Sequence, residues 1–199
     1  MKRFSSVIID RFVMQVISFG FFISVPLFLE KIEGMNPPES GMFFSVMTLT
    51  TAIISLLVGL FYKNSRTWLA IIFGFLILIL ASVGWLIFLL YSFNSFLVLS
   101  FILFGISFGV LYPQVNIEFM ESLEEVKDRN MSSGLFYTSS LFFSVIGVCI
   151  TTAILGSSSV LSKEAYRHLL VVWIVLAIFG IIFRSIRKTN SKNLSCNIN

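Results

Sequence analysis

The chain has 199 residues, of which 57% are hydrophobic and only 12% are charged. So little polar surface cannot cover a water-soluble core, and a large soluble domain is excluded. The net charge of +4 would suit a nucleic-acid-binding protein if the chain were soluble. Because the basic residues instead follow the loops of a membrane protein, no nucleic-acid partner is expected.

Six apolar segments fill most of the chain, and most of them have the roughly 20 residues that a helix needs to cross a bilayer. We expect an all-α integral membrane bundle, one six-helix domain over residues 1–188 with a cytoplasmic polar tail at 189–199. Six spans are half of the number that most secondary transporters of this hydrophobic type carry. The predicted spans are residues 7–29, 41–62, 68–91, 95–117, 134–155 and 168–184.

The basic residues are distributed unevenly between the two sides of the predicted bundle. Counted by alternate loops, eleven of the 14 Lys and Arg residues fall on the side of the termini, and only Lys31, Lys163 and Arg167 fall on the other. By the positive-inside rule, both termini are in the cytoplasm and the number of spans is even. We expect a multi-pass protein of the plasma membrane, the inner membrane in a bacterium.

Two connecting segments carry recognisable signals. Between the first two spans, Gly34 and the pair Pro37-Pro38 stop one helix, and Ser40 is the expected N-cap of the next. The acidic segment 118–130 has apolar residues at helical spacing, which predicts a short amphipathic helix on the cytoplasmic surface. The alternative is a solvated connector.

The second and fifth spans begin alike, which indicates an internal repeat. Residues 40–45 read SGMFFS and residues 133–138 read SGLFYT, the same order of small, apolar, aromatic and hydroxyl side chains. If the chain consists of two three-helix units, these are corresponding helices. Three spans bring the second unit into the membrane from the opposite side, so the repeat is predicted to be inverted.

Small and hydroxyl residues form one stripe on each of these two spans, at intervals of three and four residues. Such stripes let helices pack closely in lipid. The alternative is that the hydroxyls and Tyr137 line a water-filled cavity through which a solute passes. The stripes consist of Gly41, Ser45, Thr48, Ala52, Ser55 and Gly59, and of Ser133, Tyr137, Ser140, Ser144, Gly147 and Thr151.

The fourth span combines Gly105, Gly109 and Pro113, each four residues from the last. The glycines permit close helix contact, and the proline frees a backbone carbonyl and bends the helix, so these residues are candidates for a pivot. Gln114 and Asn116 follow the bend. They are either candidate cavity or gate residues or residues at the interfacial end of the helix.

Polar residues are rare inside the remaining spans. Gln15 and Ser18 share a face of the first span, and a buried amide needs a partner or a ligand, so both are candidate cavity residues. Asp10 and Glu118, near the ends of their spans, are the only candidate proton-linked carboxylates. The alternative is that both are charges at the membrane interface, with Asp10 paired to an arginine.

No pattern of enzyme chemistry is present in the sequence. His168 is the only histidine, and Cys149 and Cys196 have no neighbour with metal-ligand spacing. We therefore expect no catalytic residue, no metal, no cofactor and no disulfide.

Four segments resemble a known family in order and distance. They are VPLFLEKIEGMNPPESG, the helix that ends in Gly59, GISFGVLYP and SSGLFYTSSLFFSVIG. Over about residues 10–185 the chain resembles the C-terminal six helices of major facilitator superfamily transporters, and most of all the fourteen-helix drug:proton antiporter branch. The parts most specific to the resemblance are the loop with Gly34, Pro38 and Gly41, the helix with Gly105, Gly109 and Pro113, and Gly134 with Gly147 thirteen positions on.

The resemblance implies proton-driven export of drugs or small metabolites, by rocking of two six-helix halves around a site at mid-membrane. It also implies a partner, either a second copy of this chain or a separate six-helix half, while the solute stays unknown. After Gly59 the family has an acidic and then a basic residue, where this chain has Lys63 and Asn64. This departure favours the alternative of a non-transporting interaction subunit or the remnant of a truncated transporter.

Overall fold

The computed structural model describes residues 2–61, 67–91, 94–123, 129–156 and 162–196. These residues form an all-α bundle, and no strand occurs among them. The helices are α1 (Lys2–Lys31), α2 (Pro37–Phe61), α3 (Thr67–Tyr91), α4 (Asn94–Leu123), α5 (Arg129–Gly156) and α6 (Lys163–Cys196).

Each helix contains an apolar stretch of at least 24 residues, enough to cross a membrane. The prediction of six helices long and apolar enough to cross a membrane is therefore confirmed, and the helices run further than the predicted spans. The largest differences are at α6, which begins at Lys163 and continues through most of the predicted polar tail to Cys196. Apolar pattern marks only the part of a helix that lies in lipid, because the helical ends beyond it can be polar.

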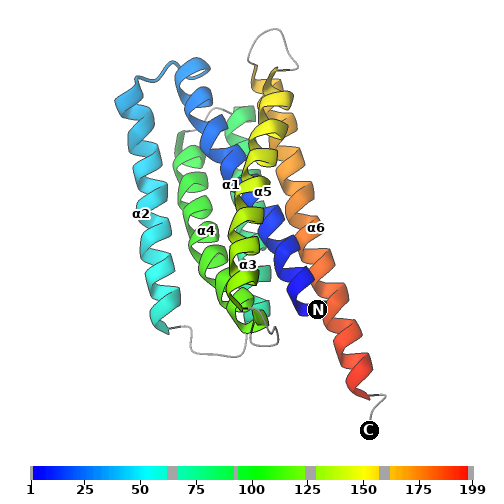
Figure 1. Cartoon of the computed structure of the whole chain (residues 1–199). Helices are drawn as coiled ribbons and strands as arrows, with labels where there is room; N and C mark the ends of the chain where they lie inside the picture. The colour runs from blue at the N-terminus through cyan, green and yellow to red at the C-terminus, as the bar shows by residue number, and fades with distance from the viewer. Residues whose placement is uncertain (1, 62–66, 92–93, 124–128, 157–161, 197–199) are drawn as a thin grey trace.

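The packing of the helices follows a twofold plan (Figure 1). α2, the second helix of the first unit, packs on α4, the first helix of the second unit, and α5 packs on α1 in the same way. The third helices, α3 and α6, pack on each other. This exchange of partners between residues 2–91 and residues 94–196 is the arrangement of an inverted repeat, so the predicted pair of three-helix units is confirmed.

Both termini lie at the same end of the bundle, the lower end in Figure 1. We call this end the termini end and the opposite end the far end. At the far end, Lys163 of α6 forms an ion pair of 2.9 Å with Glu33, just after α1.

Aromatic side chains fill the middle of the bundle. The ring of Phe21 on α1 lies 5.5 Å from Trp85, 4.3 Å from Phe104 and 5.9 Å from Trp173, measured between ring centroids. All four side chains are buried. Edge and tilted contacts of this kind add to the dispersion energy that holds helices together in lipid.

The turn between α1 and α2 differs from the prediction in one detail. Gly34 has a φ of 68°, a left-handed conformation that ends α1, as expected. Ser40, however, is not the N-cap of α2, because the carbonyl of Asn36 accepts the Ser40 N–H at 3.0 Å and the Glu39 carboxylate accepts the Asn36 N–H at 3.2 Å. Asn36 is the cap, since Pro37 has the fixed φ of a first helical residue.

The predicted amphipathic helix over residues 118–130 is wrong for the residues that the structure describes. Residues 118–123 continue α4, α5 begins at Arg129, and residues 124–128 lie outside the described part of the chain. The reason is packing at the termini end. The ring of Phe119 stacks on that of Phe136 in α5 at a centroid distance of 3.6 Å, and both are buried, so the segment belongs to the bundle.

Candidate functional site

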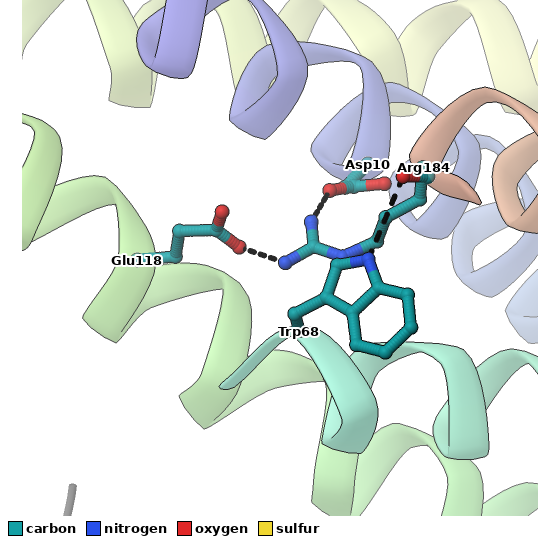
Figure 2. Close-up of polar contacts among 4 residues, drawn as sticks. All are labelled: Asp10, Trp68, Glu118 and Arg184. Carbon is teal, nitrogen blue, oxygen red and sulfur yellow. Dashed lines mark hydrogen bonds and ion pairs between the residues drawn. The ribbon is translucent and has the colours of Figure 1, made fainter. Parts of the chain in front are cut away.

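A buried cluster of charges joins three helices near the termini end (Figure 2). The guanidinium of Arg184 on α6 donates one hydrogen bond to the Asp10 carboxylate of α1 and another to the Glu118 carboxylate of α4. Asp10 is 1% exposed, Arg184 3% and Glu118 7%. Removing these charges from water costs several kcal/mol per ion, and the arginine offsets part of that cost for both carboxylates.

The third helix of the first unit also contacts this cluster. The indole N–H of Trp68, at the start of α3, lies 3.5 Å from the backbone carbonyl of Arg184 and points toward it (Figure 2). We call Asp10, Glu118 and Arg184 the ion triad. An arginine partner for Asp10 was one of the two alternatives for this residue, but periodicity could not show which arginine, because Arg184 is 174 residues away.

A second buried cation lies beside the triad. The Nε of Arg11 donates to the Ser140 hydroxyl at 2.9 Å, and its Nη1 donates to the Asn116 side-chain oxygen at 3.3 Å. Its guanidinium carbon lies 5.7 Å from the ring centroid of Tyr112 and 5.1 Å from that of Phe136. Among the described residues, therefore, the hydrogen-bond and ring partners of Arg11 are all neutral. Cation–π contacts of this kind gain strength where water is excluded.

The candidate cavity residues of α1 lie on the same side of the bundle. The hydroxyl of Tyr112 donates to Ser18 at 3.0 Å, and Ser18 in turn donates to the backbone carbonyl of Gln15 at 3.3 Å. Gln15 is buried, and its Oε1 has no hydrogen-bond partner in the described part of the chain. We call Arg11, Gln15, Ser18, Tyr112, Asn116 and Ser140 the polar wall.

Sequence reasoning missed Arg11 and Tyr112 as members of the polar wall. Arg11 was counted only as a loop charge for topology. Tyr112 directly precedes Pro113 and was not included among the candidate cavity residues. The signal that could have identified Tyr112 is its i, i+4 spacing from Asn116, which places both residues on one face of α4.

A hollow of about 210 Å³ adjoins the polar wall, between α1, α2 and α4. Thr48 lines it, but Thr48 and Ser45 are exposed, and their hydroxyls donate to backbone carbonyls of their own helix at 2.9 Å. Tyr137 of α5 is 54% exposed. These three hydroxyl side chains are placed on open surface of this chain. The residues lining the hollow are Phe22, Met47, Thr48, Thr51, Ala52, Phe108 and Tyr112.

The two small-residue stripes have different surroundings. On α5 the stripe packs against α1, since a Cβ at Gly147 would lie 2.5 Å from the carbonyl oxygen of Val16. On α2 the stripe is mostly exposed, and a Cβ at Gly41 or Gly59 would meet no described atom within 4 Å. The same holds for Gly134. Close packing within this chain therefore explains the α5 stripe, whereas the glycines at the two ends of the α2 stripe, Gly41 and Gly59, have no close neighbour in the described structure.

The glycines of α4 bring it close to α2. A Cβ at Gly105 would lie 2.7 Å from the Met47 carbonyl oxygen, and one at Gly109 would lie 2.9 Å from that of Thr51. Pro113 has no N–H to offer the carbonyl of Gly109, and the hydroxyl of Ser55 on α2 donates to that carbonyl at 3.1 Å instead. A pivoting role for this region stays a prediction.

Gln114 lies apart from the polar wall. It is two residues from both Tyr112 and Asn116, so it points to another side of α4. It borders a groove of about 550 Å³ between α2 and α3, and neither side-chain atom has a hydrogen-bond partner among the described residues. An orphaned buried amide costs roughly 1–3 kcal/mol. α4 continues beyond it to Leu123.

The described residues contain no group of three or more His, Cys, Asp or Glu side chains that could hold a metal ion.

Comparisons with known proteins give one match. The family described as Major Facilitator Superfamily matches residues 7–195, which is nearly the whole chain. Searches of curated proteins and of solved structures returned no significant match. The six apolar helices, their inverted repeat and this match agree, and the chain belongs to the Major Facilitator Superfamily, a family of membrane transporters.

Proposed function

We propose that this chain forms the C-terminal type of six-helix half in an exporter of drugs or small metabolites, like the fourteen-helix drug:proton antiporter branch. In this proposal, the half moves against a second six-helix half and exposes the polar wall to each side of the membrane in turn. Protons drive the export, and the ion triad binds them. The termini end faces the cytoplasm of the plasma membrane.

The observation that carries the proton coupling is the shared arginine. Arg184 binds Asp10 on α1 and Glu118 on α4, which are the corresponding first helices of the two inverted units. Proton uptake by either carboxylate removes its charge and weakens its bond to Arg184. One proton would therefore loosen one of these two first helices from α6 while the other stays attached. Arg11, the residue after Asp10 on α1, carries a further buried charge.

The polar wall supports a pathway for a solute. Arg11 is a buried cation with neutral partners, so it can attract an anionic or strongly polar group of a solute without first giving up a carboxylate. The buried Gln15 adds an acceptor that has no partner among the described residues. The hollow next to Tyr112 gives an approach to this wall from the open side of α2.

The exposed side of α2 supports the need for a second half. Its large apolar side chains and its stripe of small residues face outward together, and only a small share of the helix is buried in this chain. The partner is either a second copy of this chain or a different six-helix half. Crosslinking in native membranes, followed by mass measurement of the complex in mild detergent, distinguishes these partners from a monomer.

A transport assay tests the proposed coupling. Everted membrane vesicles containing the protein are energised with a pH gradient, and uptake of the fluorescent dye ethidium is followed. Asp10→Asn and Glu118→Gln should abolish uptake driven by the gradient but leave exchange of dye at equal pH. The matched control is Glu164→Gln, an exposed carboxylate on α6 outside the triad. Wild-type uptake by both triad variants, at equal protein amounts, would exclude the proposed role.

A second candidate function is that of a non-transporting subunit or a transporter remnant. It is favoured by the same triad, because two carboxylates already bound to one arginine are also the arrangement of a purely structural tie. The two candidates differ in whether the unaltered protein transports the dye. If the triad is only structural, Glu118→Gln lowers thermal stability, and no dye gradient forms in vesicles that hold the unaltered protein.

A further inference from the structure

We propose that the groove between α2 and α3 binds a single-chain amphiphile whose polar end is an uncharged carboxylic acid or primary amide. This site is separate from the polar wall and the ion triad, and it does not depend on the proposed transport function. Two observations lead to it: the shape and lining of the groove, and the orphaned and fully buried amide of Gln114.

The groove is apolar and opens sideways. Its volume is about 550 Å³, within the range of sites that hold small molecules. On α3, Leu69, Phe73 and Leu76 border it and are 43–59% exposed, so the medium beside it in a membrane is lipid hydrocarbon. The full lining is Val58, Leu69, Ala70, Ile72, Phe73, Leu76, Val110 and Gln114.

Gln114 is the only polar residue of this lining, and it lies at the bottom of the groove. Its side chain is 0% exposed, and both Oε1 and Nε2 lack a hydrogen-bond partner in the described part of the chain. Inside a membrane, such groups need partners from protein or ligand, because hydrocarbon offers none. A small displacement of the covering apolar side chains brings the end of a ligand into contact with the amide.

The chemistry of the amide selects the polar end of the ligand. A carboxamide presents one donor and one acceptor side by side. A protonated carboxylic acid complements both, since its O–H donates to Oε1 while its carbonyl accepts from Nε2. A primary amide does the same. An ester, which has no donor, satisfies only Nε2, and a carboxylate anion leaves Oε1 without a donor.

The complete burial of Gln114 disfavours a charged head group. An ion held against this amide would leave water without a counter-ion from the residues that line the groove, none of which is charged. The occupant is therefore a neutral amphiphile, held by its chain along α3 and by two hydrogen bonds at Gln114.

Photolabelling tests this site directly. The full chain is reconstituted in phosphatidylcholine vesicles that contain a 16-carbon fatty acid with a photoreactive diazirine in its chain, and labelled residues are located by mass spectrometry. We expect labels on residues 69–76 and on Val58. Unlabelled palmitic acid and palmitamide should compete, whereas methyl palmitate should compete roughly tenfold less well because it lacks the donor.

Three variants distinguish the site from general contact with lipid. Gln114→Leu removes both hydrogen bonds and should weaken competition by palmitamide about tenfold or more, while the protein stays folded because an orphaned polar group is lost. Ala70→Phe fills the groove and should abolish labelling there. Leu80→Phe, on an exposed part of α3 outside the groove, should change nothing. Labels spread over all lipid-facing helices, equal competition by methyl palmitate, or unaltered competition in Gln114→Leu would each overturn the proposal.

Discussion

Arg184 of α6 binds Glu118 of α4, 66 residues away in sequence, at a place where both side chains are almost completely buried. The arginine simultaneously holds Asp10, so the last helix is attached to the first helix of each repeat. The arginine offsets part of the cost of burying both carboxylate charges. The stability of the termini end should therefore depend on Arg184 more than on any surface charge.

Replacing the arginine tests this dependence. Arg184→Met leaves two buried carboxylates without their shared partner and should lower the free energy of unfolding by roughly 3–5 kcal/mol. The measurement is thermal unfolding in mild detergent, followed by tryptophan fluorescence. Arg167→Met serves as the control, because it removes an exposed pair with Glu164 that contributes less than about 1 kcal/mol. Equal melting temperatures of the two variants would contradict the structural importance of the triad.

Two glycines of α5 should respond in opposite ways to a single methyl group. Gly147→Ala forces a Cβ to within 2.5 Å of the Val16 carbonyl and should destabilise the α1–α5 contact by about 1–3 kcal/mol. Gly134→Ala meets open space in the described structure and should stabilise the helix by roughly 0.5–1 kcal/mol. Thermal unfolding of both variants checks the pair, and the same sign for both would show that the packing of α1 on α5 is wrong.

Alanine substitutions of two serines in the small-residue stripes should differ in their effect on stability. Ser140→Ala removes the acceptor of the buried Arg11 Nε and should cost about 1–3 kcal/mol of stability. Ser45→Ala removes only an exposed hydroxyl that donates to its own helix and should change stability by less than about 0.5 kcal/mol. Chemical unfolding curves in detergent provide the comparison. A large loss in Ser45→Ala would indicate that the α2 stripe has a neighbour that this chain does not supply.

The orientation in the membrane can be measured with single cysteines. In a background of Cys149→Ser and Cys196→Ser, Lys163→Cys should react in intact cells with a maleimide that cannot cross membranes. Lys163 is exposed at the far end, and the proposed topology, which rests on the eleven-to-three division of basic residues, puts that end outside the cytoplasm. Thr67→Cys, at the opposite end of the bundle, should react only after the cells are opened. The reverse pattern would invert the proposed topology.

Much of the fold could be predicted from local sequence pattern. The six spans follow from apolar length, since lipid requires each crossing segment to satisfy its own backbone hydrogen bonds. The left-handed turn at Gly34 and the close contacts of Gly105 and Gly109 follow from residue type at known spacing, because the absence of a Cβ has the same local consequence in any fold.

Tertiary structure alone decided which polar residues meet. Asp10, Glu118 and Arg184 are on three different helices, and Gln114 and Asn116, two residues apart, belong to different sites. Periodicity gives the face of one helix but not the helix that covers it, because that depends on how all six pack. The amphipathic segment at 118–123 was misread for the same reason, since only the position of Phe136 shows that Phe119 is buried in the bundle and not exposed on its surface.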